Sequence, residues 1–448
     1  MGSLSLQEQT LVHDLKVTIL SSTKLYPSEK QERRSMFLSN IDQVLDFNVH
    51  TVHFFKKNTK FSIENVVEKL KLALEKLLVA YDFLAGRLTF NNGEGRLEID
   101  CNGEGVRFIV GSSELCLEDL GELDYPNPAF KQLAAEQAFD DCVEEKLDQP
   151  LCVFQVTSFK CGGFAMGVCN NHCTFDGISF QTFLINLAAI AAGKPLAVPP
   201  CNDRHLLAAR SPPTVKFPHP ELIKLQPSSN PNSSMITCTN TNLKLNHKLF
   251  HLTSKDISTL KQKAQGCKYT ITSFNVMAAH LWRCKALVSN TMKLSTDETS
   301  MLFAVNLRPR LKPPLPQSYT GNAVLSAWCS TTNKALKEGS FKEVVEVVCE
   351  GGRRMDDEYA RSVIDWGELY KGFPKGDVFV SSWWKLGFEE VVYPWGKPVY
   401  SCPVVVPSQD ITVVFPAIGG VDEGVNVLVA LPCELMDHYS TLFYEFLH

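Results

Sequence analysis

The sequence predicts an α/β protein built from two domains. Strand-like and helix-like patterns alternate in both halves of the chain, and a stretch rich in Pro, Ser and Asn separates the halves. A length of 448 residues allows two medium-sized domains, each with its own core. We therefore expect an N-terminal domain over 1–198, a crossover loop over 199–235 and a C-terminal domain over 236–448.

The N-terminal half shows clear element patterns. An apolar stripe at helical spacing predicts a helix over 66–80. Short β-rich pieces follow it, and two stronger strands then come as PLCVFQVTSF and GGFAMGVCN. A helix is expected over about 176–192, because Gly193 and Pro195 supply a stop signal.

The C-terminal half resumes α/β patterning after the crossover. Its expected helices lie over 254–265, 273–287 and about 340–360. Its expected strands lie over 300–307 and around 378–383, 400–405, 411–416 and 425–431.

Composition and charge argue against several kinds of binding partner and cellular location. The formal net charge is −5 without a basic block, which argues against nucleic acid as a partner. No apolar run approaches the ~18 residues that a transmembrane helix needs. The N-terminus lacks the charged and apolar regions of a secretory signal. Fifteen cysteines sit largely in apolar runs without a CxxC pair, so we expect a reducing cytoplasm and no metal site.

The sharpest local feature is Asn-His-Cys-Thr-Phe-Asp-Gly at 171–177, between an apolar strand and a helix. Neutral imidazole at His172 can take a proton from a hydroxyl, since its ordinary pKa lies near neutrality. Asp176 could orient the ring or fix the loop, and Gly177 leaves room for a substrate. A histidine and an aspartate at this spacing also occur by chance, so a structural histidine is the alternative.

Five further blocks accompany that segment in order along nearly the whole chain. They read YDFLAGRL (81–88), DRHLLAARSPP (203–213), TSFNVMAAHLWRCKA (272–286), VNLRPRLKPPLPQSYTGNAV (305–324) and SSWWKLGFEEVVYPWGKP (381–398). Together with PLCVFQVTSFKCGGFAMGVCNNHCTFDGISF, they resemble the BAHD family of plant acyl-CoA-dependent acyltransferases. The family is known by its HxxxD and DFGWG motifs.

This resemblance implies a fold and a reaction. The fold would be two chloramphenicol-acetyltransferase-like domains, each a mixed β-sheet flanked by helices, with a solvent channel at their interface. An acyl-CoA would be the co-substrate, with no tightly bound cofactor and no metal. His172 would deprotonate an alcohol that attacks the thioester directly, without a covalent acyl-enzyme. The resemblance also implies a monomer.

Roles for further residues follow from the same resemblance. Trp383 would give an indole N–H to the oxyanion, with Ser381 beside the acceptor, although a lone Trp usually packs in a core. Asp176 would turn away from the channel and pair with Arg308. For coenzyme A we expect phosphate contacts at Thr272 and Ser273, which open a helix, with added charge from the lysines of the preceding helix. Those lysines are Lys261 and Lys263, and a solvated helix face is the alternative for them.

The chain departs from the family pattern at its DFGWG position, which reads Val392-Tyr393-Pro394-Trp395-Gly396. The missing aspartate leaves any former partner without its charge and puts donor handling in doubt. The base is unaffected.

The acceptor is expected to be uncharged: an alcohol, a steroid or terpenoid, or a phenolic. Relatives that use shikimate hold its carboxylate with an arginine, whereas only Lys371 and Lys375 stand between Arg361 and Trp383. Three alternatives stay open: a non-catalytic partner protein in lipid metabolism, an amide-forming N-acyltransferase, and a small-molecule binding protein.

His50 and His53 lie three apart on an expected strand and would face opposite sides, which disfavours a metal pair. His280 is expected to be a packed structural histidine.

Overall fold

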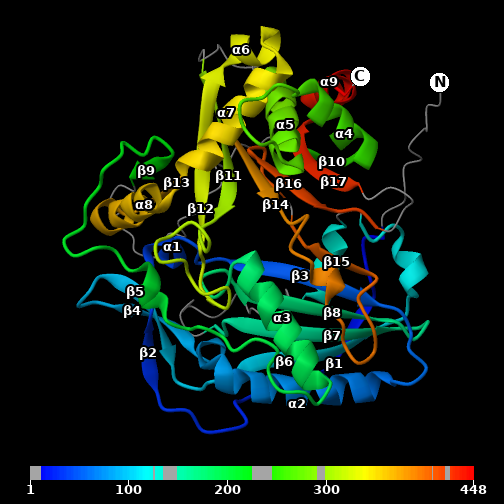
Figure 1. The fold of residues 1–448 in the computed structure, drawn as a ribbon. Coiled ribbons are helices and arrows are strands. Elements are labelled where there is room, and N and C mark those ends of the chain that lie inside the picture. Colours follow the sequence, from blue (N-terminus) through cyan, green and yellow to red (C-terminus); the bar gives the residue numbers. More distant parts are fainter. Residues whose placement is uncertain are drawn as a thin grey trace. The chain divides into compact units, whose positions relative to one another are not determined.

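The computed structural model describes residues 12–124, 127–134, 149–224, 245–289, 298–405, 407–418 and 424–447. These residues form two compact units. Unit 1 comprises 1–205, 318–322 and 386–406, and unit 2 comprises 206–317, 323–385 and 407–448. Both units contain sheets and helices, as predicted for a mixed α/β protein (Figure 1).

Unit 1 is built on a six-stranded sheet in the order β1-β6-β7-β8-β3-β15. Only β6 and β7 run parallel, so the sheet is mixed. A smaller sheet has the order β2-β5-β4. The strands are β1 (Val17–Leu25), β2 (Arg34–Phe37), β3 (Asn48–Phe55), β4 (Arg87–Asn91), β5 (Arg96–Cys101), β6 (Val106–Ser113), β7 (Cys152–Phe159), β8 (Phe164–Asn171) and β15 (Tyr400–Pro403).

The predicted helices of unit 1 are present and pack beside each other. They are α2 (Ile63–Ala80) and α3 (Gly177–Ala191), and Figure 1 shows both along one side of the sheet. Within α2, Ser62 caps the N-terminus, and the buried stripe falls on Val66, Leu70, Ala73, Leu74, Leu77 and Leu78. A short helix, α1 (Asn40–Gln43), precedes β3. Every residue of β8 is buried, which explains the apolar run FAMGVC over its first six residues.

Unit 2 is built on a second six-stranded mixed sheet, in the order β10-β17-β16-β14-β11-β12. Helices α4, α7 and α9 pack against α5, and α9 also contacts β10 and β17. The strands are β9 (Leu222–Lys224), β10 (Leu245–Leu252), β11 (Glu298–Asn306), β12 (Val324–Thr332), β13 (Gly372–Pro374), β14 (Val378–Ser382), β16 (Ile411–Pro416) and β17 (Val425–Pro432). The helices are α4 (Ser254–Lys263), α5 (Ser273–Ser289), α6 (Asn333–Glu338), α7 (Phe341–Arg354), α8 (Asp357–Tyr370) and α9 (Cys433–Glu445).

The expected helix over 340–360 is in fact two helices. Helix α7 ends at Arg354, and the side chain of Asp356 then accepts a hydrogen bond from the Tyr359 amide to cap α8. An aspartate in extended conformation starts a new helix rather than continuing the old one. Strands β10 and β12 and helix α9 were not predicted.

Two segments distant in sequence complete unit 1. Strand β15 pairs antiparallel with β3, with Tyr400 opposite Phe54. Cys201 and Tyr319 form an isolated bridge, which holds 318–322 against the start of the expected crossover. Therefore 318–322 and 386–406 belong to the unit that carries His172, although both were placed in the 236–448 range.

Within the described ranges, no helix has both the length and the apolar character to cross a membrane.

Candidate active site

His172 follows directly on β8, at the point where the buried strand ends. Its backbone N–H donates to the Phe47 carbonyl at 2.8 Å, and its ring lies 5.1 Å from the Phe47 ring. His172 is partly exposed, whereas its neighbours Asn171 and Cys173 are buried. The fold thus fixes the backbone of this histidine and leaves the residue partly exposed, with its ring Nδ1 buried.

A buried ion pair between Asp42 and Arg204 supports the loop that carries His172. The Asp42 carboxylate is 3.1 Å from an Arg204 guanidinium nitrogen, and the two side chains are 0% and 1% exposed. Arg204 also donates to the carbonyls of Cys173 at 3.3 Å and Thr174 at 2.8 Å. One arginine therefore holds two consecutive carbonyls of the HxxxD loop. Its hydrogen bonds are strong because the donor is charged, and Asp42 balances that charge.

Asn322 ties the same network to the backbone of His172. Its Nδ2 donates to the His172 carbonyl at 2.8 Å and to Asp42 Oδ1 at 2.8 Å. Its backbone N–H also donates to Asp42 Oδ1, at 3.0 Å. The Asn322 amide and the Asp42 carboxylate are both buried, so water does not compete for their hydrogen bonds.

Asp176 caps helix α3. Its carboxylate accepts from the Ser179 backbone N–H at 2.9 Å and from the Ser179 hydroxyl at 3.0 Å, and its own N–H donates to that hydroxyl at 2.9 Å. In the described part of the chain, His172 Nδ1 has no hydrogen-bond partner. In these contacts the carboxylate caps the helix, and the architectural role of Asp176 that the resemblance implies stays a prediction.

The environment of His172 favours its neutral form. Burial lowers the pKa of the ring below 6.5, while its own backbone and Asp176, Asn322 and Asp42 oppose part of that shift. A neutral imidazole has one unprotonated ring nitrogen and can accept a proton at neutral pH.

Gly177 is the first residue of α3 and packs closely on a neighbour. A Cβ added there would lie 2.7 Å from Cδ1 of Leu386. The Leu386 side chain would have to shift to admit a larger residue, and the expected room for a substrate stays a prediction.

The remaining predicted catalytic and acceptor residues lie in unit 2. Ser381 is in β14 opposite Val413, and the Trp383 backbone N–H donates to the Val414 carbonyl at 2.6 Å. Both residues are partly exposed, so the indole of Trp383 is not a fully buried core side chain. Arg308 is buried and donates from its backbone N–H to Asn306 Oδ1 at 3.1 Å. Its pairing with Asp176 stays a prediction.

The expected coenzyme A residues gather where α4 ends and α5 begins. Thr272 Oγ1 accepts from the Asn275 backbone N–H at 3.2 Å, so the predicted start of α5 is correct. The first N–H groups of α5 belong to Ser273 and Phe274, and such groups suit a phosphate. Lys261 and Lys263 lie in the last turn of α4, where Lys263 Nζ donates to the Phe446 carbonyl at 3.0 Å.

The altered DFGWG stretch is a packing element of unit 1. Tyr393 and Trp395 stack at 5.3 Å, and the Trp395 ring also meets those of Phe55, Phe61 and Phe164 at 6.1–6.4 Å. Val392, at the position of the missing aspartate, is 64% exposed. An exposed position can lose a carboxylate without leaving a buried charge unpaired, so the substitution does not disturb this cluster.

Sequence reasoning missed three residues that hold the histidine loop: Asp42, Arg204 and Asn322. The latter two lie inside blocks that carried the family resemblance, but no role was assigned to them. That signal was available, whereas Asp42 lies outside every such block.

A second histidine cluster, in unit 2, has the order of a hydrolase triad. His219 lies between Glu221, at 3.1 Å from Nδ1, and Ser362, at 2.7 Å from Nε2. Ser362 is 0% exposed and also accepts the Lys216 backbone N–H at 2.9 Å. A serine so enclosed cannot meet a substrate, so this cluster fastens residues 216–221 of the expected crossover to α8.

His50 and His53 have different surroundings in β3. His53 is buried and its Nδ1 lies 2.8 Å from the Ser401 hydroxyl, whereas His50 is partly exposed. His280 is fully buried beside Phe443, with ring centroids 4.8 Å apart. His280 is thus a packed histidine, as expected, while the absence of a metal pair at His50 and His53 stays a prediction.

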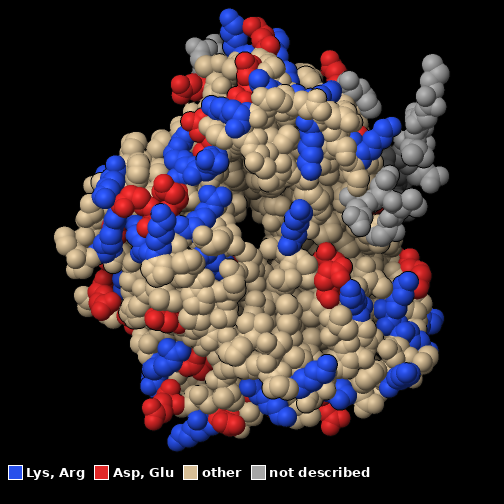
Figure 2. Space-filling model, viewed as in Figure 1, with Lys and Arg blue, Asp and Glu red and all other residues tan. Residues whose placement is uncertain are grey.

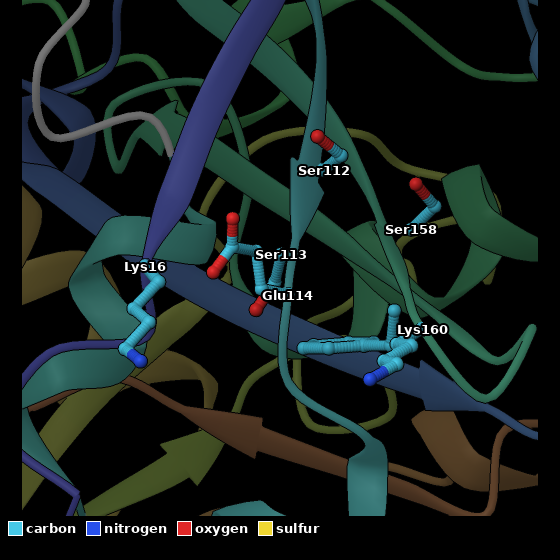
Figure 3. Close-up of a pocket in the computed structure, with 7 residues that line it drawn as sticks. Lys16, Ser112, Ser113, Glu114, Ser158 and Lys160 are labelled. Carbon is cyan, nitrogen blue, oxygen red and sulfur yellow. The ribbon is translucent and has the colours of Figure 1, made fainter.

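A surface hollow of unit 1 lies apart from the histidine. It is lined by residues at the ends of β6 and β7 together with Lys16, and it does not include His172 (Figure 3). The lining residues are Lys16, Ser112, Ser113, Glu114, Ser158, Phe159 and Lys160. On the face shown in Figure 2, basic and acidic side chains are interspersed, which matches the near-balanced charge of the sequence.

Comparison with known proteins identifies the chain as a transferase. The family model described as the Transferase family matches residues 15–446. Two solved structures share the fold: vinorine synthase (TM-score 0.74, 23% identity, covering 94% of this chain and 96% of that one) and F. graminearum TRI101 complexed with coenzyme A and deoxynivalenol (TM-score 0.72, 15% identity, covering 91% and 97%).

Three Arabidopsis thaliana proteins are similar over nearly their whole length. Acyltransferase GLAUCE is 54% identical over 99% of both chains. Omega-hydroxypalmitate O-feruloyl transferase is 34% identical over 94% of this chain and 91% of its own. Fatty alcohol:caffeoyl-CoA acyltransferase is 33% identical over 94% and 97%. The chain belongs to the BAHD family of acyl-CoA-dependent acyltransferases. The predicted family, fold class and enzyme class are confirmed.

Proposed function

We propose that this chain transfers a hydroxycinnamoyl group from its coenzyme A thioester to the hydroxyl of an uncharged aliphatic alcohol, with His172 as the general base. The observation that carries the proposal is the His172 imidazole. The residue is partly exposed, the burial of its ring lowers its pKa and so favours the neutral form, and the surrounding backbone is fixed by buried hydrogen bonds.

The reaction requires one proton to move out and back. Neutral His172 takes the alcohol proton as the oxygen attacks the thioester carbonyl, which forms a C–O bond and a tetrahedral oxyanion. The oxyanion collapses with cleavage of the C–S bond, and the imidazolium returns its proton to the leaving thiolate. Trp383 is our candidate for the oxyanion donor, with Ser381 beside the acceptor and Asp176 paired with Arg308 as a structural support.

The substrate class rests on two kinds of support. The names of two relatives combine a phenylpropenoyl donor, feruloyl or caffeoyl-CoA, with an aliphatic hydroxyl acceptor. This chain also offers only Lys371 and Lys375 where a carboxylate-gripping arginine would stand. A lysine is a point charge and reproduces a bidentate grip poorly, which favours an uncharged acceptor.

A panel of substrates tests this function. Purified protein is offered feruloyl-, caffeoyl- and acetyl-CoA, each with a long-chain primary alcohol, a long-chain amine, a sterol and shikimate, and products are weighed by mass spectrometry. We expect an ester of the alcohol with a hydroxycinnamoyl donor, formed fastest of all pairs. An amide as the main product, a shikimate ester, or thioester binding without any product would each overturn the proposal.

The pH profile reports the protonation state of His172. Only the neutral ring accepts a proton, so activity falls as pH falls through the pKa of the free enzyme, and burial places that pKa below 6.5. We expect kcat/KM to be level from about pH 7 upward and to decrease only at pH values below 6.5. An acid limb centred above 6.5 would contradict the assigned environment of the ring. The residual activity of His172→Gln should lack this limb.

The proposed coenzyme A contacts at the start of α5 predict an effect on donor binding. An added carboxylate in Ser273→Asp repels phosphate where the helix N–H groups would attract it. We expect the KM for acyl-CoA to rise by about 10-fold, the equivalent of ~1.4 kcal/mol, with kcat nearly unchanged. Ser254→Asp is the matched control, because Ser254 is the first residue of α4 behind a threonine cap, as Ser273 is in α5. Equal effects of both substitutions would remove α5 from the donor site.

We further propose that the enzyme acts as a monomer in the cytoplasm, for which the family resemblance is the support. A single species near 50.0 kDa in light scattering is the expected result.

A further inference from the structure

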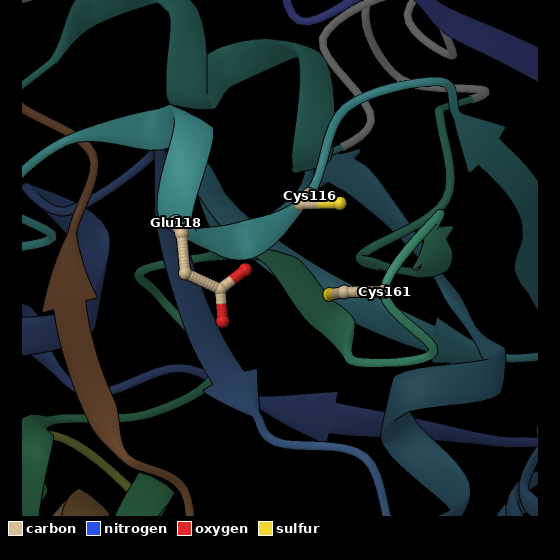
Figure 4. Close-up of side chains that lie close together, drawn as sticks. All are labelled: Cys116, Glu118 and Cys161. Atoms are coloured by element: carbon tan, nitrogen blue, oxygen red, sulfur yellow. The ribbon is translucent and has the colours of Figure 1, made fainter.

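Two cysteines and a glutamate meet on unit 1, away from the histidine loop. Cys116 precedes the 3-10 turn Leu117–Leu120, which carries Glu118, and Cys161 lies in the turn between β7 and β8. One ligand atom from each of the three lies within 4.8 Å of the others. Figure 4 shows the Glu118 carboxylate and the Cys161 sulfur directed toward the same space, with Cys116 beside it.

We propose that Cys116, Cys161 and Glu118 form a binding site for a thiophilic divalent cation, with Zn²⁺ as the best fit. In the described part of the chain, they are the one group of three such ligands close enough to share an ion. Two thiolates and a carboxylate are common Zn²⁺ ligands, and three protein ligands leave one tetrahedral position for water. The partial exposure of both cysteines gives the ion a path from solvent.

The loops that carry the ligands are already held together. The Lys160 backbone N–H donates to the Leu115 carbonyl at 2.9 Å, so the residues before each cysteine are joined directly. The Leu117 N–H donates to Cys161 Sγ at 3.4 Å. The Cys161 turn itself is closed by the Gly162 N–H on the Phe159 carbonyl at 2.8 Å. An ion would therefore bind without ordering a loose segment, which lowers the entropic cost of binding.

A bound cation would change the protonation of the cluster. Cysteine ligates a metal ion as the thiolate, so a divalent cation on Cys116 and Cys161 would release up to two thiol protons. The affinity for the ion should therefore rise with pH.

Cobalt(II) titration tests the site, because Co²⁺ replaces Zn²⁺ and gives thiolate absorption bands. Reduced, oxygen-free wild-type protein should show one such band at a one-to-one ratio, and Zn²⁺ should abolish it. Cys116→Ser and Cys161→Ser should each weaken binding by at least about 100-fold, beyond the ~10–100-fold of losing an outer-sphere partner. Glu118→Gln should weaken cobalt binding by about 10-fold, because it removes the charge of one ligand and leaves both thiolates in place.

The chain offers a matched control for the thiols. Cys267 and Cys349 form a second close thiol pair, in which Cys267 also raises the pKa of Cys349, yet the pair is not part of a three-ligand group in the described ranges. Cys267→Ser should leave the cobalt band intact. Zn²⁺ should also raise the Tm of the wild type and of Cys267→Ser but not of Cys161→Ser, and far-UV circular dichroism confirms that each variant is folded.

Three results would overturn the proposal. These are the absence of a thiolate band, a band that Cys161→Ser retains, and a band that Cys267→Ser removes. Mass spectrometry covers the remaining case: a Cys116–Cys161 disulfide formed in air, together with no cobalt binding by the reduced protein, would make this a redox pair and not a metal site.

Discussion

Replacing His172 by alanine should lower kcat by about 10²–10⁴-fold, the usual contribution of a positioned general base, and leave the fold intact. The expectation of an intact fold comes from the hydrogen bonds of this residue. The loop is held through the backbone N–H and carbonyl of residue 172, which bond to Phe47 and Asn322, whereas the ring Nδ1 has no partner in the described chain. Alanine keeps both backbone groups, so we expect the variant to lose catalysis while the hydrogen-bond network stays intact.

Two further histidine variants sharpen this experiment. His172→Gln keeps a polar side chain of similar size but cannot cycle a proton at neutral pH, and it should lose as much activity as alanine does. His438→Ala removes an exposed histidine of α9 and should change neither kcat nor Tm. Full turnover in His172→Ala would refute the mechanism. A Tm loss equal to that of a core variant would instead assign the ring a structural role.

The regular elements near His172 could be predicted because their signals are local. The strand patterns of β7 and β8 and the apolar stripe of α2 each lie within one continuous stretch of sequence. The break between α7 and α8 was missed because the apolar pattern continues through it, while the aspartate cap that starts α8 competes with that pattern. Helix α9 carries polar residues such as Asp437 and His438 between its buried positions, and it is stabilised by packing on β10, β17 and α5.

The support of the site could not be predicted from local patterns. Asp42 and Asn322 are 280 residues apart in sequence, and Arg204 lies 30 residues beyond the carbonyl of Thr174 that it binds. A buried charge pair of this kind leaves no periodic pattern, because each member is a single polar residue in an otherwise ordinary segment. By contrast, His172 and Asp176 could be proposed from the sequence because they share one short loop.

Replacing Arg204 by leucine should reduce the free energy of unfolding by about 3–5 kcal/mol, the usual cost of removing one partner from a buried ion pair. Asp42 would remain buried at 0% exposure without its cation, and the carbonyls of Cys173 and Thr174 would lose their donor. The HxxxD loop would then shift, and a displacement of ~1 Å at a catalytic group can cost about 10²-fold in rate. We expect a lower Tm and a lower kcat together, measured by calorimetry and saturation kinetics.

The charge explanation is tested by a second substitution at Asp42. Asp42→Asn in the Arg204→Leu background removes the uncompensated charge but keeps an acceptor for Asn322, so the double variant should be more stable than Arg204→Leu alone. Lys24→Met breaks an exposed pair with Glu104 and should cost less than about 1 kcal/mol. If the double variant were less stable than Arg204→Leu, the loss would come from packing of the arginine and not from a stranded carboxylate. Leucine cannot replace the two contacts that Arg204 makes with the loop carbonyls. An unchanged Tm in Arg204→Leu would therefore show that the stability of the histidine loop does not depend on the Arg204–Asp42 pair.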